Sequence, residues 1–217
     1  MRGVELSGLL VAFEGLDACG KSSLIEAVSQ ELQKRGREIL KLAEFSDSEV
    51  GVALQTLLEQ DSFLVPKEKG PLSMYGFSLV FSDLVYFNEK FIIPALSSNK
   101  IILKDRHVAS VFSCEIPKIL SDYESKSISE LIDWMGELLK PLKKPDLTIM
   151  LKLPAEVQEA RLCERGETVT DDMRSIYKQR DLIYERVSDH NVVEVDNSGD
   201  FEETVKNICK IIESNVV

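Results

Sequence analysis

The sequence has no long uninterrupted hydrophobic run, although 44% of its 217 residues are hydrophobic. Charged residues interrupt each apolar segment well before the roughly 20 residues that a membrane-spanning helix needs. Near the N-terminus, Glu14 ends an apolar run that is too short for a secretory signal. These features argue against an integral membrane protein, and we expect a cytoplasmic protein that has no membrane partner.

Cysteine and positive charge are both scarce. The four cysteines lie far apart and form no C-x-x-C pair, which indicates reduced thiols rather than a disulfide framework or a zinc site. Lysine and arginine number 26 against 37 acidic residues, which gives a formal net charge of −11. A protein that binds a nucleic-acid polymer needs the opposite sign, so we expect no such partner. A bound polyphosphate must then be held by local groups.

Repeats, low-complexity segments and Gly/Ser linkers are also missing, so the length favours a single domain over residues 1–217. Short apolar runs alternate with longer amphipathic segments. This alternation predicts an α/β fold with three layers, in which helices cover both faces of a mostly parallel five-stranded sheet. The predicted strands are Leu9–Glu14, Glu38–Ala43, Ile101–Lys104, Leu147–Leu153 and Val192–Val195.

Three helices have clear sequence signals. An apolar stripe begins after Lys21 and ends near Gly36. Ser127 and Glu130 form the S-x-x-E pattern of a capping box, and an apolar helical face follows them. A similar face begins at Phe201. We interpret all three faces as core or subunit contacts.

One motif carries chemistry. The segment from Gly15 to Ser22 reads G-x-x-x-x-G-K-S, between a predicted buried strand and a predicted helix. The glycines allow the backbone to approach phosphate closely, and successive N–H groups at the helix N-terminus then surround it. In such a loop Lys21 contacts the β- and γ-phosphates and the Ser22 hydroxyl can ligate Mg²⁺. We therefore expect a nucleotide site at Gly15, Leu16, Asp17, Ala18, Cys19, Gly20, Lys21, Ser22 and Ser23.

The residues at the variable positions of this motif indicate which family of nucleotide-binding proteins the sequence resembles. "FEGLDACGKSS" closely resembles the signature of the thymidylate kinase family. Further similarities follow in the same order along the chain, in "IILKDRHVAS", "PDLTIMLKL", "EARLCERG" and "VVEVDNSGD". The resemblance covers most of the chain and implies a P-loop NTPase fold. It also implies transfer of the γ-phosphate of ATP–Mg²⁺ to a nucleoside monophosphate, above all dTMP.

The resemblance assigns roles to individual residues. Asp105 follows a predicted strand and would hold Mg²⁺ together with Ser22, because ligands of parallel sheets bind at the carboxyl ends of strands. Arg106 would contact the acceptor phosphate, and Asp17 would face the acceptor sugar. The implied catalytic residues are Lys21, Asp105, Arg106 and Arg165. The implied acceptor-binding residues are Asp17, Phe45, Phe81, Arg106, Ser110 and Glu115, although Phe81 is as well explained by packing within its helix.

The resemblance also implies a lid over about residues 162–174. Arg161 would stack on the adenine, with Asn197 in the loop beside it. The phosphate loop has no arginine between Leu16 and Cys19, which is typical of the subtype whose lid carries the catalytic arginine. Arg165 is our first choice for that role and Arg174 the second.

In one respect the chain departs from the family. Thymidylate kinases hold the acceptor phosphate with further arginines, but no arginine lies between Arg37 and Arg106. Two such contacts, each of about 1.5–3 kcal/mol, would be missing. Lys67, Lys69 and Lys90 are the candidate replacements, although a lysine copies the arginine fork poorly.

This departure leaves two alternatives to a dTMP kinase. In the first, the acceptor carries no phosphate, as in a deoxynucleoside. In the second, the chain is a paralogue that binds ATP without catalysis. Small-molecule nucleotides are the expected partners in each case. The resemblance further implies a homodimer through 128–139 or 79–93, whereas a monomer with these faces in its core fits the residues equally well.

Overall fold

The computed structural model describes residues 7–60, 72–123, 126–187 and 191–216. Within these ranges the sheet has five strands, all parallel, in the order β2-β3-β1-β4-β5. The strands are β1 (Leu9–Glu14), β2 (Ile39–Leu42), β3 (Ile101–Asp105), β4 (Leu147–Lys152) and β5 (Val192–Asp196). Each coincides with a predicted strand, with ends that differ by one residue at most.

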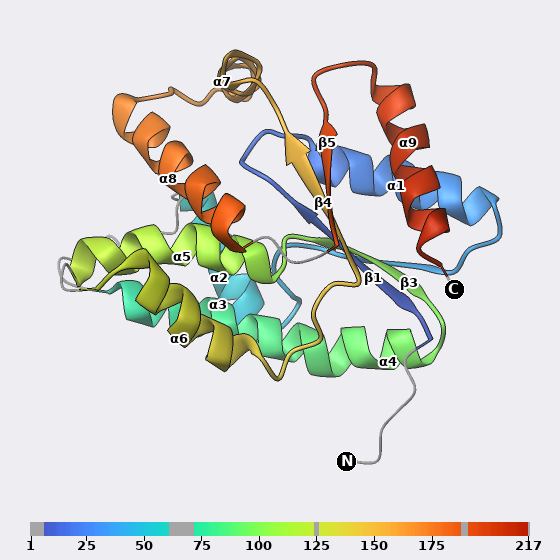
Figure 1. The fold of residues 1–217 in the computed structure, drawn as a ribbon, viewed down its shortest axis with the longest axis horizontal. Coiled ribbons are helices and arrows are strands. Elements are labelled where there is room, and N and C mark those ends of the chain that lie inside the picture. Colours follow the sequence, from blue (N-terminus) through green and yellow to red (C-terminus); the bar gives the residue numbers. More distant parts are fainter. Residues whose placement is uncertain (1–6, 61–71, 124–125, 188–190, 217) are drawn as a thin grey trace.

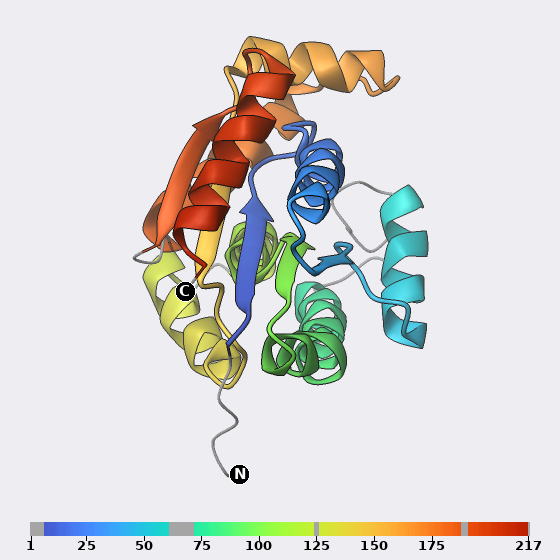
Figure 2. The same cartoon turned by 90° about the vertical axis from the view of Figure 1, so that its right-hand side faces the viewer.

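Helices connect the strands and cover both faces of the sheet (Figure 1). Figures 1 and 2 show α7 and α8 at the end of the sheet opposite the N-terminus, which is where the strands have their carboxyl ends. The helices are α1 (Lys21–Lys34), α2 (Glu49–Gln60), α3 (Ser73–Phe87), α4 (Ile93–Ser97), α5 (Val108–Asp122), α6 (Ile128–Leu139), α7 (Ala155–Glu164), α8 (Asp171–Val187) and α9 (Phe201–Ser214). A π-helical segment, Asn88–Ile92, joins α3 to α4.

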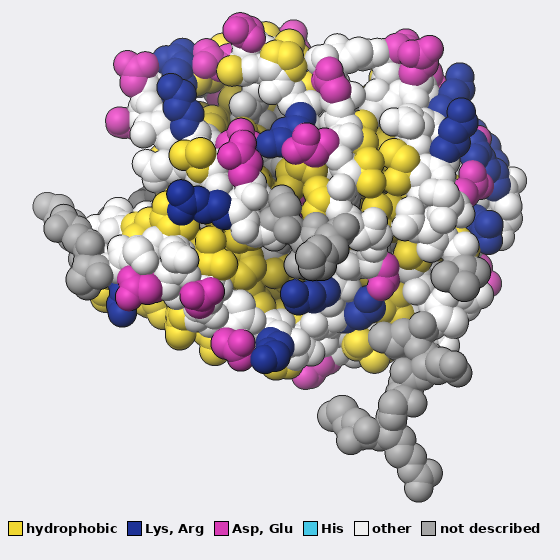
Figure 3. All heavy atoms as spheres, viewed as in Figure 1, with side chains coloured by type: hydrophobic (Ala, Val, Ile, Leu, Met, Phe, Trp, Pro, Cys, Tyr) yellow, Lys and Arg dark blue, Asp and Glu magenta, His cyan; other side chains and the backbone are white. Residues whose placement is uncertain are grey.

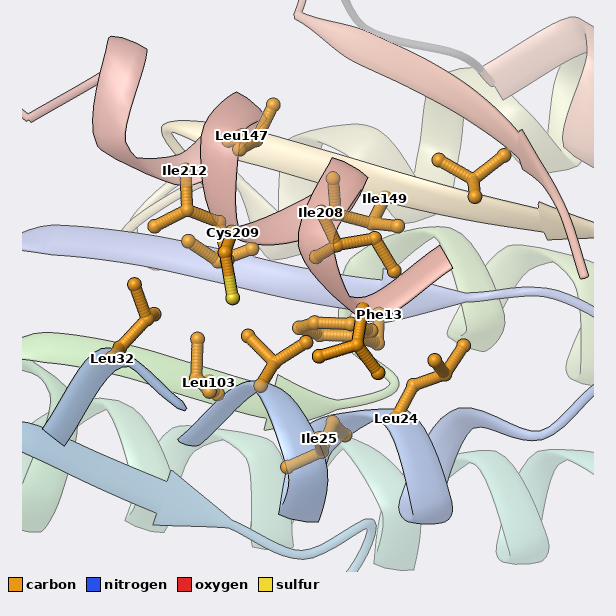
Figure 4. Close-up of a cluster of buried hydrophobic side chains, with 14 of the residues drawn as sticks. Phe13, Leu24, Ile25, Leu32, Leu103, Leu147, Ile149, Ile208, Cys209 and Ile212 are labelled. Atoms are coloured by element: carbon orange, nitrogen blue, oxygen red, sulfur yellow. The ribbon is translucent and has the colours of Figure 1, made fainter. Parts of the chain in front are cut away.

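The main core lies between the sheet and the pair α1 and α9 (Figure 4). Side chains of a strand alternate between faces, so Val11 and Phe13 belong to this core while Leu10 packs against α4 on the other face. Apolar residues of α1 and α9 fill the space above β1, β3 and β4, among them Leu24, Leu32, Ile208 and Ile212. Burial of these stripes explains why the sequence pattern located both helices correctly.

The two edge strands, β2 and β5, are more exposed than expected for strands that helices cover on both faces. Only Leu42 of β2 and Val195 of β5 are buried, whereas all six residues of β1 are buried. The physical reason is position, because β2 and β5 each have a strand neighbour on one side only.

A second apolar cluster joins α3, α5, α6 and α8 on the opposite face. The capping box predicted for α6 is present, because Ser127 accepts from the backbone of Glu130 and the Glu130 carboxylate accepts from Ser127.

On the surface, acidic and basic side chains are interspersed with apolar ones over the face seen in Figure 3. None of the helices in the described part of the chain is both long and apolar enough to cross a lipid bilayer.

Candidate active site

The phosphate loop connects β1 to α1, and two of its glycines have backbone angles that other residues rarely adopt. Gly15 has φ 136° and Gly20 has φ 92°. A Cβ on Gly15 would lie 2.6 Å from the Leu151 carbonyl oxygen, and one on Gly20 would lie 2.5 Å from Nδ2 of Asn197. Both glycines are therefore required by backbone angle and by space.

Nothing in the described chain caps the start of α1 with a side chain, and its N-cap is Gly20. The first N–H groups of a helix have no partner within it, so an uncapped start is a site for an anion. Lys21 lies beside these groups, where its Nζ donates to the carbonyl oxygens of Gly15 at 3.2 Å and Leu16 at 3.0 Å, and lies 3.6 Å from Sγ of Cys19. The loop thus holds its lysine over the place where a phosphate would bind.

Ser22 and Asp105 lie side by side at the carboxyl ends of the strands. The Ser22 hydroxyl donates to Oδ2 of Asp105 at 2.8 Å, and Oδ1 of Asp105 is buried with no hydrogen-bond partner among the described residues. One hydroxyl and one carboxylate fit Mg²⁺, which binds few protein ligands and takes its others from water and phosphate. The unpaired oxygen is a further reason to regard this pair as suited to a cation.

A buried carboxylate positions the residues after β3. Glu14, the last residue of β1, accepts from the backbone N–H of His107 at 2.8 Å and of Ser110 at 3.2 Å, and from the Ser110 hydroxyl. Burial raises the pKa of Glu14, although these hydrogen bonds and Arg106 oppose the shift. Arg106 itself has φ 57°, a left-handed conformation that costs energy for a residue with a Cβ.

Two arginines from distant parts of the chain meet at Asp17. Arg106 Nη2 pairs with Oδ1 of Asp17, and Arg180 Nη1 of α8 donates to Oδ2 at 2.7 Å. Arg106 Nη1 also donates to the Gly15 carbonyl at 3.0 Å, and its Nε lies 3.3 Å from the Glu44 carboxylate. Burial raises the pKa of Asp17, but the charges of Arg180, Arg106 and Lys21 outweigh it and hold the pKa well below its usual range.

Lys104, one residue before Asp105, ties the ends of β2 and β3 together. Its Nζ donates to the carbonyl oxygens of Ala43 at 2.5 Å, Glu44 at 3.0 Å and Asp105 at 3.0 Å, and it lies 4.2 Å from the centre of the Phe87 ring. The side chain is 1% exposed. Burial lowers the pKa of Lys104 to about 8.

The stretch between Arg37 and Arg106, which has no arginine, contains a buried carboxylate that binds backbone and hydroxyl groups. Asp83 of α3 is buried and accepts from the backbone N–H of Ser46 at 3.0 Å and from the Ser48 hydroxyl at 3.0 Å. It therefore fixes the segment after β2, where the family has arginine. Of the three lysines proposed to compensate, Lys90 is exposed and pairs with Asp47 at 3.9 Å. Lys67 and Lys69 lie outside the described residues.

One cavity of about 550 Å³ collects most of the predicted site residues. It extends from the phosphate loop, along the ends of β1 and β3, to the space between α3, α5 and α8. The predicted residues that line it are Asp17, Ala18, Gly20, Lys21, Ser22, Ser23, Phe45, Asp105, Arg106, Ser110, Glu115 and Arg165. Gly15, Leu16 and Cys19 line a smaller cavity of about 60 Å³.

Phe81 does not line the large cavity. Its ring stacks on Phe77 at 6.0 Å, within the cluster that joins α3 to α5. The assignment of Phe81 to the acceptor site is therefore not supported, and the packing explanation accounts for it. On the same helix, Val80, Leu84 and Phe87 line the cavity instead.

Arg161 and Asn197, the residues that the resemblance assigns to the adenine, contact each other and the phosphate loop. Arg161 Nη2 donates to the Asn197 carbonyl at 2.8 Å, and Asn197 Nδ2 donates to the Cys19 carbonyl at 2.9 Å. The last strand and α7 thus both contact the loop near Gly20.

The expected lid takes in the end of α7, the connection at 165–170 and the start of α8. α7 ends in a Schellman turn, in which Gly166 has φ 83° and the Glu167 N–H bonds the Leu162 carbonyl at 3.1 Å. This turn leaves Arg165 on the cavity wall. Arg174 lies in α8, where Glu159 at 2.8 Å and Asp171 at 2.7 Å hold its guanidinium on the surface.

Sequence reasoning missed Arg180 and Lys104. Both line the cavity and both are almost fully buried. Neither lies in a motif, but each had a signal. Lys104 interrupts a buried strand, and Arg180 lies on the same helical face as Tyr177 and Tyr184, where the chain places few other polar groups.

Comparisons with known proteins agree on one family. The family model described as thymidylate kinase matches residues 13–208. A probable thymidylate kinase of Archaeoglobus fulgidus is 28% identical over 207 residues, 95% of each chain, and a thymidylate kinase of Thermoanaerobacter pseudethanolicus is 28% identical over 158 residues, 72% of this chain and 71% of the relative.

The fold is similar as well. A solved structure of thymidylate kinase from Candida albicans superimposes with a TM-score of 0.71 at 21% identity, and the match covers 96% of this chain and 92% of that one. Because the family model extends over most of the sequence, the chain belongs to the thymidylate kinase family.

Proposed function

We propose that this protein transfers the γ-phosphoryl group of ATP to dTMP, which yields dTDP and ADP. The observation that supports the proposal best is the single cavity that joins a phosphate loop to two buried arginines, Arg106 and Arg180. A kinase needs both ends, because its donor and acceptor phosphates must meet in one water-poor space.

The donor end is formed by the phosphate loop. Lys21 and the uncapped start of α1 bind the β- and γ-phosphates, and Ser22 with Asp105 holds Mg²⁺. When bound, Mg²⁺ neutralises charge on the phosphates. Arg161 and Asn197 form the nucleoside side of this end.

The acceptor end uses Arg106 together with Arg180. Both guanidinium groups pair with Asp17. Arg180 keeps an Nε–H that no described residue accepts as a hydrogen bond, whereas the Nε of Arg106 lies 3.3 Å from the Glu44 carboxylate. An arginine pair suits a dianionic phosphate, because each fork can make two charge-assisted hydrogen bonds. Arg180 thus supplies from α8 the positive charge that the stretch between Arg37 and Arg106 lacks, and a phosphorylated acceptor is favoured over a free nucleoside.

The transferred group passes between these two ends without a covalent enzyme intermediate. Arg165 lies on the cavity wall and has no ion pair among the described residues. It approaches the phosphoryl group during transfer and stabilises the negative charge of the transition state. Closure of the segment around it excludes water, which would otherwise hydrolyse ATP.

The experiment that tests this proposal measures ADP release with dTMP, dUMP, other monophosphates and free deoxynucleosides. Turnover with dTMP that exceeds turnover with every free nucleoside is the expected result. Turnover of thymidine without turnover of dTMP would replace the proposal by a nucleoside kinase. ATP binding without transfer to any acceptor would indicate a non-catalytic paralogue.

We further propose a homodimer. Trp134 and Leu138 of α6 are 40% and 38% exposed, and Tyr75 of α3 is 60% exposed, so large apolar side chains remain on helices that flank the sheet. Light scattering at micromolar concentration should give about twice the mass of 24.4 kDa. A monomer mass for the wild-type protein would refute this part of the proposal.

A further inference from the structure

The wall of the large cavity near Arg106 contains two carboxylates. Glu44 follows β2 and Asp83 lies in α3, and both line the cavity. The Glu44 carboxylate lies 3.3 Å from Nε of Arg106, and Asp83 is 2% exposed. A phosphate monoester carries close to two negative charges at neutral pH. Like charges repel strongly in a poorly solvated cavity, so these two carboxylates disfavour a phosphorylated acceptor unless a nearby cation offsets them.

Lys104 is a cation on the same wall. It lines the cavity, and its Nζ donates to the carbonyl oxygens of Ala43, Glu44 and Asp105. A lysine has three N–H donors only as the ammonium ion, so three accepting carbonyl groups fit the charged form. Burial lowers the pKa of Lys104, whereas the charges of nearby carboxylates, among them Glu44 and Asp83, oppose the shift. Lys104 is therefore close enough to both carboxylates to interact with their charges.

The other cations of the cavity wall are occupied or lie elsewhere. Arg106 is shared by the carboxylates of Asp17 and Glu44. Arg180 pairs with the same Asp17 carboxylate. The remaining lysines and arginines among the described lining residues belong to the start of α1, the end of α5 and the expected lid, and they are Lys21, Lys118 and Arg165. Lys104 is thus the lining cation that the end of β3 contributes beside Glu44.

We propose that Lys104 makes this cavity selective for a phosphorylated acceptor, because its ammonium group offsets the carboxylates of Glu44 and Asp83 and allows a dianion to bind beside Arg106. This inference rests on the proposed function, since it takes dTMP as the acceptor. Lys104 is a positioning residue, because its Nζ contacts backbone carbonyl groups and acts on the acceptor through its charge. Its bond to the Glu44 carbonyl also fixes where the Glu44 charge lies.

The test compares two ligands that share a base and a sugar and differ in charge, dTMP and thymidine. Calorimetry without ATP measures their binding to the wild-type protein, Lys104→Met and Lys41→Met. Lys41 is a matched control, because it is an exposed lysine of β2 that pairs with Glu26. Lys104→Met should bind dTMP at least about tenfold more weakly than the wild-type protein and thymidine about equally, whereas Lys41→Met should change neither affinity. An equal loss for both ligands in Lys104→Met would indicate a purely structural role and overturn the inference.

Glu44→Gln provides a second test that leaves the contacts of Lys104 in place, because Lys104 binds the backbone oxygen of Glu44. This variant should bind dTMP at least about threefold more tightly than the wild-type protein, since one repelling charge is removed. The double variant Lys104→Met/Glu44→Gln should regain most of the affinity that Lys104→Met loses. Unchanged or weaker binding of dTMP by folded Glu44→Gln would overturn the inference, even if Lys104→Met did not fold.

These outcomes separate the inference from the proposed function. Wild-type protein that binds dTMP, together with a Lys104→Met variant that binds it equally well, would overturn the inference alone. Wild-type protein that binds no dTMP would overturn both.

Discussion

Oδ2 of Asp17 accepts a hydrogen bond from Nη1 of Arg180 at 2.7 Å, and this contact joins the phosphate loop to α8 across 163 residues of sequence. The Arg180 side chain is 4% exposed and that of Asp17 is 25% exposed, so the pair is largely withdrawn from solvent. Asp17 also pairs with Arg106, which makes the carboxylate the meeting point of the donor loop and the acceptor end of the cavity.

Replacement of Arg180 should therefore affect stability as well as binding. Arg180→Met should lower the free energy of unfolding by about 1.5–3 kcal/mol, because Asp17 keeps its pair with Arg106 but loses one charge-assisted hydrogen bond. Asp17→Asn should have a similar effect, and the double variant should lose less than the sum of the two. Urea unfolding at pH 7 measures all three. Strict additivity would show that the pair is not energetically coupled.

The same pair predicts sensitivity to acid. Since the folded state holds the pKa of Asp17 below its ordinary value of 3.8, the stabilisation is fully present above pH 3.8 and is lost as the pH falls below it. Asp17→Asn should abolish this part of the acid response, and a variant that keeps it would contradict the contact.

Lys21→Ala tests the phosphate loop. The variant should lose at least about a hundredfold in kcat, because a preorganised positive group is removed from the transferred phosphate. Its fold should survive, since the Gly15 carbonyl still accepts from Arg106 at 3.0 Å. Circular dichroism checks the fold and ADP release checks the rate. Near wild-type activity would disprove the assignment of the whole site.

Arg165 and Arg174 form a matched pair for the lid. Arg165→Ala should lower kcat about a thousandfold with little change in the KM for ATP, as expected when charge in the transition state loses its partner. Arg174→Ala should keep its kcat, because Arg174 is held by Glu159 and Asp171 on the surface. If kcat fell in Arg174→Ala and not in Arg165→Ala, Arg174 would be the catalytic arginine of the lid.

His107 should make the fold sensitive to mild acid. Burial lowers the pKa of His107 from 6.5 to about 3, and its two ring nitrogens have no hydrogen-bond partner among the described residues. The folded state therefore binds fewer protons than the unfolded state between these values, so stability falls as the pH drops below 6.5, by up to about 1.4 kcal/mol per pH unit. His107→Phe should unfold in urea with a smaller loss between pH 7 and pH 5. An equal loss of stability in His107→Phe and in the wild-type protein would show that His107 does not cause the acid sensitivity.

The fold could be predicted largely from local patterns. Buried parallel strands appear as short apolar runs, and helices appear as stripes with caps, so the five strands and the start of α1 follow from neighbouring residues. The exposure of β2 and β5 could not be predicted, because it depends on the strand order, which no local pattern records.

The candidate site could be predicted only in part, for a similar reason. Lys21, Ser22 and Asp105 lie in or directly after recognisable motifs, and the structure brings them together. Arg180 takes its place from the packing of α8 against α5, which is a tertiary contact. Phe81 and Phe87 lie on one helix, and only the rotation of that helix determines which ring reaches the cavity.

The amine of Lys104 has a practical consequence. A lysine with a pKa of about 8 is partly neutral in mildly alkaline buffer and is intrinsically reactive toward acylating reagents, yet this one is 1% exposed and donates to three carbonyl groups. Reagent can approach this amine from the cavity, but the amine reacts only when its hydrogen bonds to the carbonyl groups at the ends of β2 and β3 open. The rate of its acylation, followed by mass spectrometry, therefore reports how often this edge of the sheet opens in the native protein, and bound nucleotide should slow that rate.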